Sequence, residues 1–269
     1  MYKILFTDID GTLLKDDLTV GGKTVEALGR AREKGLIIAI ASGRYLASLD
    51  KFEARLGFPV LKIGLNGGAI EDESGKRLYE ERISPETAAK TASFLYGKAG
   101  NIMAFSSRAY AIDCDDSWYE KQAEVMRAWG VRMDIRDIGK VTEALGEAPF
   151  KVLAKDRDFK LIDGLLPLVR EEVGGEANVV SSGRGIIEVL PYGMDKREGI
   201  KRTGEILGIA PEEMIAFGDW DNDIGMLGYA GLGVVMANGS AGAKAAAAME
   251  TLSNNDDGIA YALEKLGLV

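Results

Sequence analysis

Ile4-Leu5-Phe6-Thr7-Asp8-Ile9-Asp10-Gly11-Thr12 is the stretch that decides the fold of this chain of 269 residues. Its apolar start predicts a first strand, and two carboxylates follow where that strand ends. Side chains two positions apart in a strand point to the same side, and a glycine lets the chain turn away directly after them. Asp8 and Asp10 are therefore expected to face one reacting atom. A plain surface turn is the alternative, because Asp and Gly are common in turns.

Apolar, strand-like runs alternate with amphipathic, helix-like stretches at both ends of the chain. In the first third these are a helix over residues 23–34 that Gly35 ends, a strand over 36–41, a helix over 45–56 and a strand over 60–65. In the last third they are a helix over 197–207, a strand over 214–217, a helix after Asp221, a strand over 232–236 and two final helical segments. This alternation predicts an α/β fold with a doubly wound, Rossmann-like core built on a parallel sheet.

The middle of the chain has a different pattern. Short runs that alternate between apolar and polar side chains cover residues 103–106, 110–113, 151–154 and 186–190. Helical stretches separate them, over residues 85–98, 118–129 and 159–173. Alternation with one polar side is typical of an antiparallel sheet, here with one face open to solvent or to the site. We therefore predict an inserted α+β cap domain over residues 83–190, and a core domain formed by residues 1–82 and 191–269.

Composition narrows the classes of function. The chain is 46% hydrophobic, which is ample for a buried core, and 33 basic against 42 acidic residues give a formal net charge of -9. An acidic chain disfavours nucleic acid or an anionic membrane surface as its partner and suits a metal cation in an acidic cleft. The single cysteine, Cys114, excludes an internal disulfide and a multi-cysteine zinc site. With no apolar stretch near 20 residues, we expect a cytoplasmic protein.

Histidine is absent from the sequence. Mechanisms that use histidine as base, phosphoryl carrier or metal ligand are thereby excluded, among them Ser-His-Asp hydrolases and the usual zinc hydrolases. Neither common glycine-rich nucleotide-binding loop occurs. Carboxylates and lysines must therefore carry the chemistry.

Two further motifs fall where predicted strands end. Ser42-Gly43-Arg44 follows the second strand, where a hydroxyl, a backbone N–H and the start of a helix can all hold phosphate oxygens. Gly218-Asp219-Trp220-Asp221-Asn222-Asp223 follows a later strand, and its oxygen-rich side chains favour a hard cation such as Mg²⁺. Both motifs have a structural alternative, because Ser, Gly and acidic residues also favour the first turn of a helix.

Together these motifs resemble the haloacid dehalogenase superfamily of phosphatases. The residues that carry the resemblance, in this order, are Asp8-x-Asp10-Gly11-Thr12, Ser42-Gly43-Arg44, Lys196 and Gly218-Asp219-x-x-Asn222-Asp223. The long insertion looks like the Cof-type sugar-phosphatase branch, as do Asn66-Gly67-Gly68 and Asn254-Asn255-Asp256-Asp257-Gly258. The resemblance covers nearly the whole chain.

The resemblance implies a division of labour among these residues. Asp8 would attack phosphorus to give an aspartyl-phosphate, and Asp10 would protonate the leaving alcohol and then activate water. Lys196 would offset negative charge, with Lys201 as the weaker alternative. The implied Mg²⁺ ligands are Asp8, Asp10 through its backbone carbonyl, Asp219 and Asp223, the last as a ligand or as a group that orients a metal-bound water. The implied phosphate and substrate contacts are Ser42, Gly43, Arg44, Asn66 and Asn222, and Asn222 would also hold the lysine or loop groups.

We therefore expect Mg²⁺-dependent hydrolysis of small phosphomonoesters, sugar phosphates first, through an aspartyl-phosphate. A phosphomutase that uses the same intermediate is a close alternative, and a phospho-aspartate signalling module is a rival from another class. The expected partner is a small phosphorylated metabolite, and the expected state is a monomer or a small homo-oligomer. Arg108, Tyr110 and Arg184 are candidate substrate contacts in the cap, and Trp220 is a candidate for narrowing the entrance.

Overall fold

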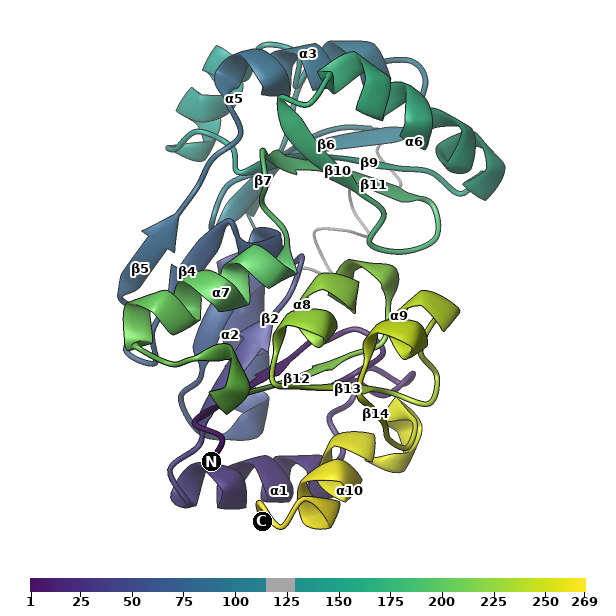
Figure 1. The fold of residues 1–269 in the computed structure, drawn as a ribbon. Coiled ribbons are helices and arrows are strands. Elements are labelled where there is room, and N and C mark those ends of the chain that lie inside the picture. Colours follow the sequence, from purple (N-terminus) through teal and green to yellow (C-terminus); the bar gives the residue numbers. More distant parts are fainter. Residues whose placement is uncertain (115–128) are drawn as a thin grey trace. The chain divides into compact units, whose positions relative to one another are not determined.

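The computed structural model describes residues 1–114 and 129–269, which form two compact units (Figure 1). The core unit consists of Met1–Gly43, Leu49–Tyr79 and Asp195–Val269. The inserted unit consists of Arg44–Ser48 and Glu80–Met194, so its long stretch encloses the range in which we placed the cap. The helix predicted over residues 118–129 lies outside the described residues, except for Trp129, which begins a strand.

The core unit is built on a sheet in the order β14-β13-β12-β1-β2-β3-β4-β5. Its strands are β1 (Ile4–Thr7), β2 (Ile37–Ala41), β3 (Leu61–Gly64), β4 (Ala69–Glu71), β5 (Arg77–Glu80), β12 (Met214–Gly218), β13 (Leu232–Val235) and β14 (Met249–Glu250). From β14 to β3 every neighbouring pair is parallel, and β4 then pairs with β3 antiparallel. The predicted α/β class with a parallel-sheet core is confirmed.

Helices cover both faces of this sheet, with α7 and α8 on one face and α1 and α10 on the other (Figure 1). The helices are α1 (Gly22–Glu33), α2 (Leu46–Leu56), α7 (Lys196–Leu207), α8 (Ile224–Tyr229), α9 (Ala241–Ala246) and α10 (Gly258–Lys265), and short 3-10 turns are η1 (Leu65–Gly67), η2 (Pro211–Glu213), η3 (Asp221–Asp223) and η4 (Asn254–Asp256). Ile200 of α7 and Met226 of α8 pack on Ile4 and Phe6 of β1 in one buried cluster. Across the described ranges, no helix has the length and apolar character needed to cross a membrane.

The inserted unit is built on a second sheet in the order β10-β11-β9-β6-β7-β8. Its strands are β6 (Asn101–Phe105), β7 (Ala109–Asp113), β8 (Trp129–Arg132), β9 (Lys151–Lys155), β10 (Ala177–Val180) and β11 (Ile186–Pro191), and its helices are α3 (Pro85–Leu95), α5 (Ile138–Leu145) and α6 (Phe159–Val173). The pairs are antiparallel except β7 with β8, which is parallel. This is the mostly antiparallel α+β arrangement that the alternating pattern predicts.

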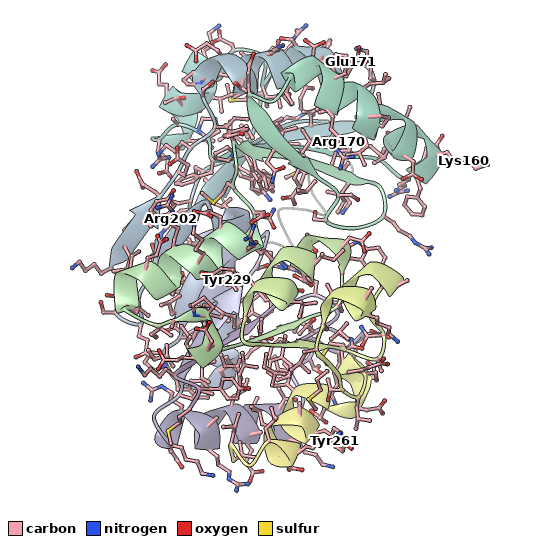
Figure 2. All side chains as sticks on the ribbon, viewed as in Figure 1. Lys160, Arg170, Glu171, Arg202, Tyr229 and Tyr261 are labelled. Atoms are coloured by element: carbon pink, nitrogen blue, oxygen red, sulfur yellow. The ribbon has the colours of Figure 1, made fainter. Side chains whose placement is uncertain are left out.

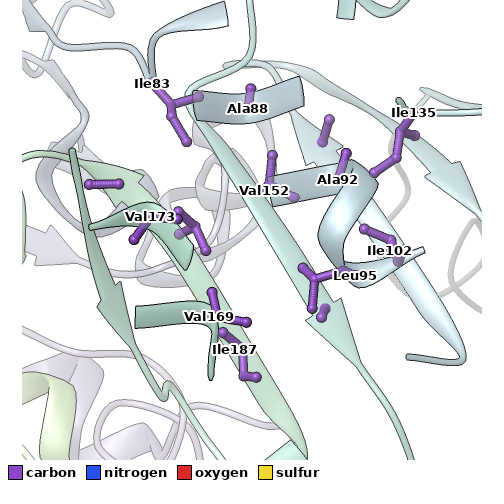
Figure 3. Close-up of a cluster of buried hydrophobic side chains, with 14 of the residues drawn as sticks. Ile83, Ala88, Ala92, Leu95, Ile102, Ile135, Val152, Val169, Val173 and Ile187 are labelled. Atoms are coloured by element: carbon purple, nitrogen blue, oxygen red, sulfur yellow. The ribbon is translucent and has the colours of Figure 1, made fainter. Parts of the chain in front are cut away.

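The three helices pack on one face of the second sheet around a buried apolar cluster, in which Ala92 and Leu95 of α3 meet Ile102 of β6 and Val152 of β9 (Figure 3). Arg170 of α6, labelled in Figure 2, also donates to the carbonyl of Val179 in β10 at 3.3 Å. The opposite face carries Phe105, Tyr110, Lys151 and Glu188, all of which are buried. On that face Lys151 pairs with Glu188 at 2.9 Å, and Tyr45 of the Arg44–Ser48 segment stacks on Phe105. Those side chains are thus shielded from solvent.

Candidate active site

Two acidic segments meet at the carboxyl ends of the adjacent strands β1 and β12. The two strands pair in parallel up to Thr7 and Phe217, and the N–H of Asp8 donates to the carbonyl of Phe217 at 3.0 Å. Asp8 and Asp219 therefore leave neighbouring strands at the same edge. Carboxylate oxygens of Asp8, Asp219 and Asp223 all lie within 4.8 Å of one another, and the three side chains are buried. We call these three residues the acidic cluster.

A tight turn directly after Asp10 holds one side of the acidic cluster in place. Gly11 has a φ of +86°, and a Cβ at this position would collide with Oδ2 of Asp219, so the position requires glycine on both counts. The hydroxyl of Thr12 donates to Oδ1 of Asp219 at 2.8 Å. Asp10 itself is exposed, unlike the acidic cluster. Thr12 is part of the sequence motif, which predicts no role for it. The structure shows that its hydroxyl orients the carboxylate of Asp219.

Lys196 is the lysine that joins the acidic cluster. It is the first residue of α7, and Asp195 caps that helix by accepting from the N–H of Glu198 at 2.8 Å. Its ammonium donates to Oδ1 of Asp8 and to Oδ1 of Asp223 at 2.6 Å each, and its side chain is 1% exposed. Lys201, the weaker alternative, is 37% exposed and pairs with Glu198 at 3.2 Å instead.

Asp223 is tied to the protein through both of its carboxylate oxygens. Oδ1 accepts from Lys196, and Oδ2 accepts from the backbone N–H groups of Asp219 and Trp220 at 2.9 and 3.0 Å. Asp223 thus holds the loop and the lysine together. Asn222 is half-buried, and its side chain makes no hydrogen bond to any residue in the described ranges. Two carboxylates, those of Asp8 and Asp223, accept from Lys196, because they offer it opposite charge. The role predicted for Asn222 stays a prediction.

Burial and mutual repulsion shift the pKa values of the acidic cluster. Burial raises the pKa of Asp8 well above its ordinary range, and Asp223 and Asp219 raise it further, although Lys196 lowers it. Burial likewise raises the pKa of Asp219 to about 6, against the lowering effect of the Thr12 hydroxyl. For Lys196, burial works to lower the pKa, but Asp223 and Asp8 raise it above its ordinary value, so the ammonium stays charged.

The second predicted motif lies at the end of β2, the strand on the other side of β1. Ser42 is buried; its N–H donates to the carbonyl of Ile63 at 2.9 Å, and its own carbonyl accepts from the N–H of Asn66 at 3.0 Å. Asn66 is buried with a φ of +55°, and its Oδ1 would lie 3.1 Å from a Cβ at Gly43. The structure therefore brings Ser42, Gly43 and Asn66 together, and their predicted role as phosphate contacts stays a prediction.

Other predicted contacts belong to the inserted unit. Arg44 lies in this unit, where its charge adds to burial in lowering the pKa of Lys155. Of the candidate cap contacts, Tyr110 is buried, whereas Arg108 and Arg184 are exposed. Trp220, on the core unit, is half-buried. The substrate contacts predicted for the other side chains, and the narrowing of the entrance predicted for Trp220, stay predictions.

The donor set of the acidic cluster fits a hard divalent cation. Three carboxylates face a single ammonium, which leaves excess negative charge in a buried place. Oδ2 of Asp8 and Oδ2 of Asp219 make no hydrogen bond to any described residue, and each therefore has oxygen lone pairs to offer. Magnesium prefers one or two carboxylates and keeps several waters. Asp8 and Asp219 thus fit Mg²⁺, while Asp223 is engaged by the protein.

The comparison with protein families agrees with this chemistry. A family model described as haloacid dehalogenase-like hydrolase matches residues 5–263. The chain belongs to this family.

Similar proteins place the chain among the phosphatases of the haloacid dehalogenase family. It is 29% identical to a Bacillus subtilis protein, 5-amino-6-(5-phospho-D-ribitylamino)uracil phosphatase YitU, over 97% of this chain and 96% of that protein. It is 30% identical to the HMP-PP phosphatase of Cronobacter sakazakii over 86% of this chain and 82% of that protein. The solved structure of a HAD subclass IIB sugar phosphatase, BT4131, is similar with a TM-score of 0.82 and 25% identity, over 99% and 100% of the two chains. The resemblance to the sugar-phosphatase branch is thus confirmed, and the chain is a phosphomonoester hydrolase of this family.

Proposed function

We propose that this haloacid dehalogenase-type phosphatase hydrolyses small phosphorylated sugars or polyols with Mg²⁺, through an aspartyl-phosphate on Asp8. One observation carries the proposal: Lys196 joins Asp8 to Asp223 at 2.6 Å each, inside a buried cluster that also contains Asp219. A buried carboxylate with one oxygen held by an ammonium and the other unengaged within the described residues is oriented for attack.

Mg²⁺ would be held by Asp8, Asp219 and the backbone carbonyl of Asp10. When bound, the ion offsets the negative charge of the transferring phosphoryl group and of the carboxylates around it. Asp219 is kept in position by the Thr12 hydroxyl at 2.8 Å. Asp223 positions Lys196 and the loop of Asp219 through both of its oxygens, and we take Asp8 and Asp219 as the carboxylate ligands.

Asp8 and Asp10 divide the chemistry between them. In the first step the carboxylate of Asp8 forms a bond to phosphorus, the ester P–O bond breaks, and the leaving oxygen takes a proton from Asp10. In the second step a water attacks phosphorus and gives a proton to Asp10, and the bond between phosphorus and Asp8 breaks to release inorganic phosphate. Two carboxylates take different roles when their surroundings differ. Here Asp8 is buried and paired, whereas Asp10 is exposed and can exchange protons with solvent.

The phosphoryl oxygens would be bound by Lys196 and by the end of β2. The Ser42 hydroxyl and the Gly43 N–H supply donors there, next to a strand end that adjoins Asp8 in the sheet. Cationic and N–H donors fixed before the reaction stabilise the charge that develops on phosphorus at little reorganisation cost.

We assign the choice of substrate to the inserted unit, taken as the cap domain over residues 83–190. Support for a sugar or polyol phosphate comes from the relatives, which include a phosphatase of a ribitylamino compound and a sugar phosphatase. A phosphomutase would need a bisphosphate activator and would return isomerised sugar phosphate as its main product.

A phosphomonoester screen with Mg²⁺ tests the proposal, run on the wild type and on Asp8→Asn, with inorganic phosphate and the organic product both measured. We expect phosphate release from sugar phosphates without a bisphosphate activator, and loss of turnover in Asp8→Asn. The variant should remain folded, because removing one charge from a crowded acidic cluster relieves repulsion. Equal turnover in Asp8→Asn would exclude Asp8 as the nucleophile, and a stable phosphoryl-protein without turnover would favour a signalling module.

A further inference from the structure

The motif Asn254-Asn255-Asp256-Asp257-Gly258 has no part in the proposed reaction, yet it lies against the loop that follows Asp10. Asn254 is 5% exposed, and its amide donates to the carbonyl of Leu14 at 2.8 Å and to Oδ1 of Asp16 at 3.0 Å. These contacts join residues about 240 positions apart in the chain. A buried amide with both donor bonds made holds its partner loop in one place.

Two more residues of the motif fasten the same loop. Asn255 and Asp16 exchange a pair of hydrogen bonds, in which the N–H of Asp16 donates to Oδ1 of Asn255 at 3.0 Å and the amide of Asn255 donates to Oδ2 of Asp16 at 2.9 Å. Asp257 accepts from Lys15 at 3.0 Å and from the hydroxyl of Thr24 at 2.9 Å. The loop after Asp10 is therefore fixed at several points by the end of the chain.

Asn238 extends these contacts to the active-site turn. Its amide donates to the carbonyl of Gly11 at 2.8 Å, and its Oδ1 accepts from the N–H of Asn254 at 3.0 Å. Two residues further on, the N–H of Ser240 donates to the carbonyl of Asp219 at 2.8 Å. One short segment thus touches the turn after Asp10 and the backbone of Asp219 at once.

We propose that Asn238 and Asn254 are positioning residues, which set Mg²⁺ affinity and turnover by holding the Gly11 turn against Asp219. We call the two residues the C-terminal clamp. The proposal rests on the proposed function, since it takes Asp219 as a metal ligand. The path from the clamp to that ligand is short: Asn238 holds the carbonyl of Gly11, and Thr12, the next residue, donates to Asp219 at 2.8 Å. Magnesium demands near-ideal octahedral geometry, so a small shift of one ligand weakens binding. Loss of a group that orients a metal ligand typically costs about 10–100-fold in metal affinity or activity.

Three variants test the clamp. Asn254→Ala removes the bonds to Leu14 and Asp16. Asn238→Ala removes only the bond to Gly11 and the acceptor for Asn254, at an exposed position where folding is less at risk. Ser253→Ala is the matched control, because its hydroxyl bonds only to Asp256, within the same segment.

The readouts are Mg²⁺ binding to metal-stripped protein by calorimetry, kcat and KM, and circular dichroism to show that each variant is folded. We expect both alanine variants of the clamp to bind Mg²⁺ about tenfold more weakly than wild type. At a fixed, subsaturating Mg²⁺ concentration kcat should fall by a similar factor, and KM for the phosphoester should stay within about twofold of the wild-type value. Ser253→Ala should match the wild type.

Several results would overturn the clamp. One is a folded Asn238→Ala whose Mg²⁺ affinity stays within twofold of wild type. This variant is sufficient for the test if Asn254→Ala does not fold. Another is an Asn254→Ala that folds and keeps Mg²⁺ affinity within twofold of wild type. A wild type that binds Mg²⁺ but releases no phosphate from any monoester would remove the proposed function, and the clamp would still be judged on Mg²⁺ affinity.

Discussion

Lys196→Met removes the ammonium that, within residues 1–114 and 129–269, is paired with the acidic cluster, and leaves a side chain of similar length. The ammonium lies 2.6 Å from both Asp8 and Asp223, and these side chains are 1%, 8% and 0% exposed. Removing one partner from a buried ion pair typically costs about 3–5 kcal/mol, because the remaining charge is left uncompensated. For a chain of this size that corresponds to a fall of roughly 6–10 °C in Tm. Turnover should fall by about 10²–10³, as for the loss of one donor to a developing oxyanion.

The loss of stability in Lys196→Met should depend on pH, because the pKa of Asp8 differs between the folded and unfolded chain. The folded-state pKa of Asp8 is already raised by burial, and it rises further in the variant because Lys196 is the contact that lowers it. At low pH the carboxyl holds a proton and needs no cation, so the stability deficit is small. As pH rises the unfolded chain ionises freely while the folded variant must bury the charge, so the deficit grows.

Thermal unfolding at pH 5 and pH 8 measures the stability deficit. The proteins compared are metal-stripped wild type, Lys196→Met and Lys201→Met. Lys201→Met is the matched control, since Lys201 lies on the same helix but is 37% exposed and pairs only with glutamates. Its stability should lie within about 0.5 kcal/mol of wild type. A Lys196→Met protein as stable as the control, or a deficit that is equal at the two pH values, would refute the reasoning.

Three further predictions concern the metal site. The rise in Tm caused by saturating Mg²⁺ should be small at pH 5 and full at pH 7.5. The reason is that metal binding must release protons from Asp8, whose pKa is raised, and from Asp219, whose pKa is about 6. A rise in Tm that is independent of pH would contradict this. Thr12→Val removes the hydroxyl that lowers the pKa of Asp219, so calorimetry should show several-fold weaker Mg²⁺ affinity, with a larger loss of affinity at pH 6 than at pH 8. An equal loss of affinity at the two pH values would contradict this role of Thr12. Gly11→Ala should lower kcat by more than about tenfold and stability by about 1–3 kcal/mol in chemical denaturation, because the residue has positive φ and its Cβ collides with Asp219; unchanged kcat would be inconsistent with the turn geometry.

The sequence was sufficient to predict the meeting of Asp8 and Asp219. Asp8 and Asp219 both follow apolar runs that predict strands. Because parallel strands end at the same edge of a sheet, the α/β pattern predicts that the two segments meet. Lys196 could be chosen from the family resemblance, but not from local pattern, because only the three-dimensional contacts separate it from Lys201.

Other features had no local signal. Strands β4, β8 and β10 are three or four residues long, too short for two-residue alternation to stand out. The engagement of both oxygens of Asp223 depends on side-chain directions within one turn. Contacts such as Asn238 with Gly11 join positions 227 apart, and no spacing rule reports a bond that depends on tertiary packing.

A direct experiment identifies the residue that carries the phosphoryl group during turnover. A rapid acid quench of wild type reacting with ³²P-labelled sugar phosphate and Mg²⁺, followed by peptide mapping, locates the label. We expect label on the peptide that contains Asp8, lability of that label to hydroxylamine as an acyl phosphate requires, and no label in Asp8→Asn. Label on any other residue, or full turnover by Asp8→Asn, would contradict this expectation.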